Sequence, residues 1–377
     1  MTVRPFHALI VLLVLFGGFG CARTAHARSV PTPEIPMIVA ATDTEIVFHF
    51  DDEAPGELRL LELDPWLVYD AGTEYPEVWS GPSSATPRIP RTGPEDQDRL
   101  YRQFAVIDAA TGIISGAPQF VTDLSGISAR THKLLFPEEI KGVTCVVDVP
   151  DALELGIGHA NSGIDLGQIV NWRKDGEVLY YEFDGVDVPL YGTTIALFDA
   201  TWGEWTRNGV LYTPILINLL PDERDAANPL IHPQTDMENN PMGLGAFDMT
   251  DAEGVRTYIA AIEYIVERYT REDAAHGQIA ALIIGNELQA HWTWHNMGNA
   301  PAEQVIREYT LSMRLADLAA RSIHRDFKIY NSMTHFWSMI GYLNDPLKEI
   351  SGIDLLDGTL EEAKRQGDFP WHIAHHP

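Results

Sequence analysis

The chain has 377 residues and 45% hydrophobic content, which is enough for one large domain or two ordinary ones with a sizeable core. Lys and Arg together number 26 against 54 Asp and Glu, so the net charge is −28. Such a surface repels phosphate backbones and anionic lipid, and we therefore expect no nucleic acid as a partner.

Residues 1–27 have the pattern of a signal peptide. Arg4 precedes an apolar run at 8–16, and Ala-His-Ala at 25–27 is a small-x-small cleavage site. The run is too short to span a membrane. Cys21 follows Gly-Phe-Gly, which resembles a lipoprotein cleavage box. We predict a secreted or periplasmic protein without a membrane span; a lipid anchor at Cys21, holding the protein at the cell envelope, is the alternative.

Residues 28–125 are rich in short strand-like runs separated by turn residues, including 46–50, 58–63 and 100–107. This pattern predicts a small β-sandwich-like domain, in which no catalytic constellation is visible. Its aromatic residues could form a sugar platform, although core or interface packing is the more common role for such residues; they are Trp66, Tyr69, Tyr75 and Trp79.

From residue 126 to 377, strands alternate with helices, which is typical of βαβ units and a parallel sheet. A weak strand near 132–136 is followed by buried strands at 143–149, 211–220, 281–284 and 328–335, and by a last one at 371–377. We predict an α/β fold, a TIM-type (β/α)8 barrel that is incomplete after its sixth strand.

Several of these strands end in polar groups, and the carboxyl ends of barrel strands converge on one face. The residues at these ends are Asp148, Asn218, Asn286, Glu287, His335 and His375. His291, Trp292 and Trp337 lie in the loops that follow, where aromatic faces suit stacking on sugar rings or simply roof the barrel. We predict that Glu287 is catalytic and that the other residues bind substrate.

Residues 283–287, Ile-Ile-Gly-Asn-Glu, resemble the Asn-Glu motif that closes the fourth strand of clan A glycoside hydrolases, which are (β/α)8 barrels. The resemblance implies that Glu287 is a general acid/base and that Asn286 binds the sugar 2-hydroxyl. His-His-Pro at 375–377 resembles the His-x-Tyr-Pro sequence of their sixth strand.

The wider pattern is still more similar to a bacterial secreted family that is catalogued only as a domain of unknown function. The shared features are the β-rich front domain, Asp-Arg-Leu-Tyr at 98–101, Ile-Gly-Asn-Glu at 284–287 and Gly-Asp-Phe at 367–369. This resemblance runs from about residue 40 to the end of the sequence.

The chain departs from clan A in two ways. Gly285 stands where those enzymes more often have Trp, and no seventh strand supplies a nucleophilic Glu. A retaining mechanism needs two carboxylates about 5–5.5 Å apart, and the sequence offers one clear candidate. The leading interpretation is a glycoside hydrolase-like protein acting on glycosidic bonds of a poly- or oligosaccharide; a carbohydrate-binding or inactive barrel is the alternative, so enzymatic activity stays open.

A metal-dependent hydrolase is the third interpretation. Glu287, His291 and His295 are spaced at i, i+4 and i+8 and would share one face of a helix, as zinc ligands can. However, Glu287 follows a strand, and the chain has no His-Glu-x-x-His motif. We therefore expect neither a metal nor a cofactor.

Overall fold

The computed structural model describes residues 35–51, 56–144, 149–221, 224–225 and 227–376. The predicted leader at 1–27, Cys21 and Asp148 lie outside the described residues. Among the helices that are described, none has the length and apolar character needed to cross a bilayer.

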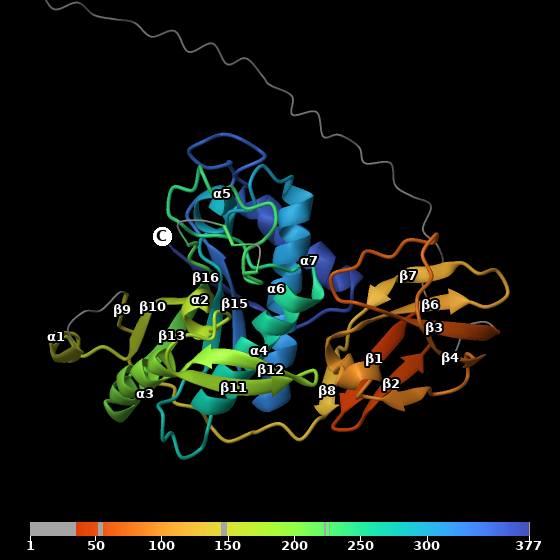
Figure 1. Ribbon diagram of the computed structural model, residues 1–377, viewed down its shortest axis with the longest axis horizontal. Coiled ribbons are helices and arrows are strands. Elements are labelled where there is room, and N and C mark those ends of the chain that lie inside the picture. The colour runs from red at the N-terminus through yellow and green to blue at the C-terminus, as the bar shows by residue number, and fades with distance from the viewer. Residues whose placement is uncertain (1–34, 52–55, 145–148, 222–223, 226, 377) are drawn as a thin grey trace, which may run out of the picture.

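Two four-stranded sheets form the amino-terminal part of the fold (Figure 1). The first has the order β5-β2-β1-β8 and comprises β1 (Met37–Thr42), β2 (Glu45–Phe50), β5 (Arg88–Pro90) and β8 (Asp123–Gly126). The second has the order β4-β3-β6-β7 and comprises β3 (Glu57–Leu63), β4 (Glu77–Pro82), β6 (Gln103–Asp108) and β7 (Ile114–Gln119). Buried rings join the two sheets, because Phe48 of β2 and Phe104 of β6 meet edge to face at 4.9 Å between centroids.

A six-stranded parallel sheet forms the second part of the fold. Its strands lie side by side in chain order: β9 (Gly142–Thr144), β10 (His159–Asp165), β13 (Leu211–Ile217), β14 (Ala281–Ile284), β15 (Lys328–Met333) and β16 (His372–His375). This arrangement is that of part of a TIM-type barrel, in agreement with the predicted α/β class. β14, which precedes Glu287, is the fourth strand, as predicted.

The first two strands differ from the prediction. Residues 132–136 form a loop, and the first strand is β9 (Gly142–Thr144), which overlaps the start of the strand predicted at 143–149; Val149 begins helix α1. The second strand is β10, between the predicted strands at 143–149 and 211–220, where no strand of the parallel sheet was predicted. Its sequence, His-Ala-Asn-Ser-Gly-Ile-Asp, lacks the continuous apolar run typical of a parallel strand because alternate residues face an open, polar side of the sheet.

Helices cover the outer face of the parallel sheet (Figure 1). The long ones are α3 (Gly192–Arg207), α4 (Ala252–Tyr269), α6 (Ala302–Ile323) and α7 (Gly352–Arg365); α1 (Val149–Glu154), α2 (Leu166–Ile169) and α5 (His291–Trp294) are short. The hairpin β11 (Val178–Phe183) and β12 (Val186–Tyr191) and the 3-10 turns η1 (Pro94–Asp96), η2 (Arg99–Tyr101) and η3 (Leu288–Ala290) complete the fold.

Glu263 of α4 joins the amino-terminal sheets to the parallel sheet. The hydroxyl of Tyr101, in η2, donates a hydrogen bond to its Oε1, and that of Tyr181, in β11, donates to its Oε2 at 3.1 Å. Burial raises the pKa of Glu263 to about 7. This carboxyl therefore holds three elements together in a poorly solvated contact.

Candidate functional site

The turn after β14 depends on a glycine. Gly285 has φ +67°, a left-handed conformation, and its N–H donates to the carbonyl of Leu216 on β13 at 2.8 Å. A Cβ at this position would lie 2.8 Å from Cδ2 of Leu288, which is fully buried. The turn therefore favours glycine at position 285, since a larger side chain would be strained in this backbone conformation and would clash with Leu288.

Glu287 follows this turn and is itself left-handed, with φ +45°. Its backbone N–H donates to Oγ of Ser332 on β15 at 3.0 Å. Its Oε1 lies 3.2 Å from Nδ1 of His376, and the two side chains are 23% and 31% exposed. The backbone of Glu287 is therefore held by a neighbouring strand and its carboxyl group by a histidine, while the side chain remains reachable from solvent.

A buried polar network fixes β14 against β15 beneath Glu287. The hydroxyl of Tyr309 on α6 donates to the carbonyl of Ile284 at 2.8 Å and accepts from the N–H of Ser332 at 3.1 Å. The amide of Gln289 pairs with both backbone groups of Thr334, at 2.8 Å each. These contacts tie the turn that bears Glu287 to the end of β15 and limit its motion.

Three loops lie over the carboxyl ends of the strands, at 218–251, 285–301 and 334–351 (Figure 1). Asn296 is fully buried where they meet; its Nδ2 donates to the Trp292 carbonyl at 2.8 Å, and its Oδ1 accepts from the N–H groups of Gly298 and Asp236 at 2.7 and 3.0 Å. The N–H of Trp292 donates in turn to the carbonyl of Lys348 at 3.1 Å. The loops thus form one hydrogen-bonded roof.

Two predicted residues form a pair on the rim of the site. The indole of Trp337 is 49% exposed and meets the ring of His375 edge to face at 6.4 Å. His335 is exposed and packs against Phe336 at 4.2 Å between ring centroids. Asn286 is half-buried beside Glu287. Since successive residues of a strand face opposite ways, His375 points away from the side of the sheet that carries His376.

Other predicted residues are engaged inside the roof. Asn218 is 2% exposed and donates from Nδ2 to the carbonyls of Leu230 and Ala246 at 2.7 and 3.0 Å. His291 is fully buried, which lowers its pKa to about 4. The ammonium of Lys348 lies 4.4 Å above the ring of Trp292. These side chains support the loops and have little or no surface for a ligand.

The geometry that a helical metal site would need does not form around Glu287. Its left-handed backbone breaks the helical spacing to His291 and His295, and His295 is 3% exposed. Burial lowers the pKa of His295 to about 3. Among the described residues, no group of three or more His, Cys, Asp or Glu side chains is arranged to hold a metal ion.

Sequence reasoning missed two groups at these strand ends. His376, and not the neighbouring His375, contacts Glu287; the His-His pair was visible, but the face of each residue was not. Asp165 ends β10, a strand that was not recognised. It is 7% exposed and accepts from the N–H groups of Leu219 and Gly167 at 2.8 and 3.1 Å, and burial raises its pKa.

Residues 135–377 match the family described as "Family of unknown function (DUF5722)", and the chain belongs to this family. This agrees with the resemblance to a domain of unknown function for this part of the chain, whereas the features expected before residue 135, the β-rich front domain and residues 98–101, lie outside the match. No curated protein matches the chain.

Solved structures with some similarity include a hyperthermophilic beta-glucosidase from Pyrococcus furiosus, at 11% identity and a TM-score of 0.32, over 59% of this chain and 51% of that one. Another is a calcium-binding mutant of Bacteroides uniformis beta-glucuronidase 2, at 9% identity and a TM-score of 0.26, over 79% and 34%. The Ruminococcus gnavus beta-glucuronidase has 10% identity and a TM-score of 0.19, over 81% and 48%. The chain thus spans about half, or less, of the length of these proteins.

Proposed function

We propose that this member of the family acts on carbohydrate, with Glu287 as the group that exchanges a proton with the glycosidic oxygen of a poly- or oligosaccharide. The observation that carries the proposal is the Glu287–His376 pair, 3.2 Å apart and partly exposed, at the carboxyl end of the fourth parallel strand. This end of a parallel barrel is where catalytic groups are found.

The pair suits proton transfer. A histidine at hydrogen-bond distance can share a proton with a carboxyl group, so His376 can return a proton to Glu287 after each proton transfer to the substrate. Among the described residues only His376 contacts the side-chain oxygens of Glu287, through Oε1, which leaves Oε2 for a substrate. Asn286 would bind a sugar hydroxyl beside it, and the exposed ring of Trp337, with His335, would stack on or bond to further sugar units. His375 would act there only through its contact with Trp337, because it points away from the side that carries His376.

Binding without turnover is the second candidate, and Asp165 favours it. A second carboxylate is needed either as nucleophile or as base. Asp165 ends β10, two strands from β14, which at about 4.8 Å per strand is roughly 10 Å. Its Oδ1 already accepts two backbone N–H bonds, and the residue is only 7% exposed, so a substrate has little access to it.

We also propose the cellular location and the amino-terminal domain type that the sequence patterns favour. The leader at 1–27 would direct the chain out of the cytoplasm, as a secreted or periplasmic protein or through a lipid anchor at Cys21. The two amino-terminal sheets, joined by the Phe48–Phe104 contact, would form a sandwich-like domain.

The test compares the wild-type chain with Glu287→Gln and with a matched exposed control, Glu303→Gln on α6. Substrates are aryl glycosides with activated and ordinary leaving groups, and binding is followed by calorimetry with oligosaccharides. Loss of the acid should lower hydrolysis of ordinary glycosides by about 10²–10⁴-fold and that of activated ones much less, while binding persists.

The results separate the candidates. Equal losses for both leaving groups would show that Glu287 is not the acid. Wild-type binding that Trp337→Ala weakens, with no hydrolysis of any substrate, would favour the binding protein. A chain that neither binds nor hydrolyses any glycoside would overturn the proposal.

A further inference from the structure

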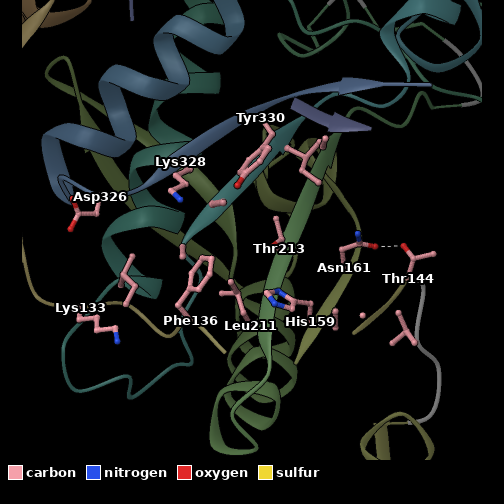
Figure 2. A pocket seen from close by; sticks show the side chains of 18 residues that line it. Lys133, Phe136, Thr144, His159, Asn161, Leu211, Thr213, Asp326, Lys328 and Tyr330 are labelled. Atoms are coloured by element: carbon pink, nitrogen blue, oxygen red, sulfur yellow. Dashed lines mark hydrogen bonds between the residues drawn. The ribbon is translucent and has the colours of Figure 1, made fainter. Parts of the chain in front are cut away.

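A cavity of about 590 Å³ lies on the concave face of the parallel sheet (Figure 2). It is lined mainly by the amino-terminal ends of the strands and extends along the sheet to Ile283, Tyr330 and Ala374. The first residue of each of five strands lines it: Gly142, His159, Leu211, Ala281 and Lys328. Register places His159 beside Leu211 and Ala281 beside Lys328, so these side chains form neighbouring positions of the floor. None of the residues that line the cavity belongs to the site around Glu287 at the carboxyl ends.

The walls are mostly apolar and carry two aromatic rings. Leu211 and Ile283 are 4% and 6% exposed and form part of the base. Phe136 is 61% exposed, and its ring lies 6.2 Å from that of His159. Tyr330 lines the cavity from β15. A volume of this size with a largely apolar lining and a few polar groups is that of a small-molecule site.

Besides Lys133, Lys328 and Asp326, the polar side chains that line the cavity are those of Thr144, His159, Asn161, Thr213 and Tyr330. Asn161 and Thr144 are hydrogen-bonded to each other across β9 and β10, as Figure 2 shows, and Thr213 lies between them and Lys328 in the sheet. A sugar needs several free hydrogen-bond donors and acceptors on the protein, and two of the polar side chains here, Asn161 and Thr144, already bond to each other. The lining thus favours a ligand with an apolar body over a carbohydrate.

The charge in the cavity is positive although the chain as a whole is acidic, with a net charge of −28. The ammonium of Lys328 lies 5.5 Å from the centroid of the Phe136 ring. Lys133 also lines the cavity, and neither lysine has an ion pair within 4 Å among the described residues. Asp326 also lines the cavity, so two lysines and one aspartate give its lining a formal charge of +1. A cation beside apolar walls attracts an anion more strongly than one in water.

We propose that this cavity binds a small organic carboxylate with a flat, apolar body. The body would lie against Leu211, Ala281 and Ile283, next to the ring of Phe136, and the carboxylate would pair with the ammonium of Lys328. The inference does not depend on the proposed carbohydrate function, because the two sites share no residue.

Three probes and four variants of the full chain test the proposal by calorimetry. The probes are 2-naphthoate, its neutral counterpart 2-naphthylmethanol, and glucuronate, a polar sugar acid. Lys328→Met keeps the side-chain length and removes the charge, and Lys364→Met, exposed on α7, is the matched control. Ala281→Leu fills the floor, and Glu287→Gln alters the other site.

We expect 2-naphthoate to bind at one site, about tenfold more tightly than the alcohol. Lys328→Met should remove this tenfold preference and leave alcohol binding within about twofold. Ala281→Leu should weaken both naphthyl probes, whereas Lys364→Met and Glu287→Gln should change neither.

The opposite results would overturn the proposal. They are the absence of saturable naphthoate binding, equal affinity for acid and alcohol, an equal loss in Lys364→Met, or tighter binding of glucuronate than of naphthoate. Light scattering tests whether a second copy of the chain occupies the cavity instead of a small molecule. A dimer that Ala281→Leu converts to a monomer would show that it does. Circular dichroism of each variant excludes unfolding as the cause of a loss.

Discussion

Replacement of Gly285 by alanine tests whether the turn beneath Glu287 needs a glycine. The residue has φ +67°, where a side chain costs about 1–2 kcal/mol. The new Cβ would also lie 2.8 Å from Cδ2 of Leu288, well inside the optimal carbon separation of about 3.5–4.0 Å. Leu288 is fully buried and has no room to retreat, and such overpacking costs about 1–3 kcal/mol more.

Gly209 provides the matched control. It has φ +71° at the end of α3, and a Cβ there would meet nothing within 4 Å. Gly209→Ala therefore carries the backbone cost alone. We expect Gly285→Ala to be more destabilising than Gly209→Ala by about 1–3 kcal/mol, as measured from urea unfolding midpoints with a common m-value.

Coupling to Leu288 identifies the source of the difference. In a double-mutant cycle, Leu288→Ala should remove the contact and recover part of the extra cost of Gly285→Ala. The reasoning is refuted if the two glycine variants differ by less than about 0.5 kcal/mol, or if the cycle shows no coupling. Glycoside binding or hydrolysis should fall with Gly285→Ala but not with Gly209→Ala, because only the first displaces Glu287.

Three buried charges give further predictions. The pKa of Glu263 is raised by burial to about 7, so wild-type stability should fall as pH rises from about 4.5 to 7, by at most about 3 kcal/mol, and Glu263→Gln should flatten this part of the melting-temperature profile. Burial raises the pKa of Glu308, but the hydrogen bond and charge of His232 outweigh it and leave the pKa below its usual range. Glu308→Gln should therefore be destabilising at neutral pH, by a margin that disappears as pH falls below about 4.5. Arg314 is fully buried and donates to the carbonyls of Ala363 and Gly367, and Arg314→Met should lower the melting temperature by more than Arg365→Met, whose side chain is exposed.

Two of the strands that were predicted correctly have apolar residues on both faces. In 211–217 and 281–284, nearly every side chain is buried, against the helices on one side and in the concave face on the other. Continuous apolar runs are the sequence pattern of such strands, and the polar residues directly after them include Glu287. This part of the site could be predicted because its position follows from one strand alone.

The partner of Glu287 could not be identified in this way. His376 reaches it from β16, two strands away, so the contact depends on the register of three strands and on which of two adjacent histidines faces the carboxyl group. A shift of one residue exchanges the two faces of a strand. Single-sequence patterns locate a strand end to within a few residues, which is too coarse to choose between His375 and His376.

β10 was not predicted from the sequence, and the reason also explains why a cavity lies beside this strand. Its residues on the concave side are His159, Asn161, Gly163 and Asp165, and no apolar side chain stands among them. In a closed barrel, bulky branched residues from alternate strands would fill this layer. Here the first two positions line a hollow instead, next to Thr213 of β13. The polar residues at alternate positions of β10 hide the strand in the sequence, and the first two of them border the cavity. A substitution that makes the sequence of β10 more apolar, such as Asn161→Val, should therefore also remove a polar side chain from the lining of the cavity.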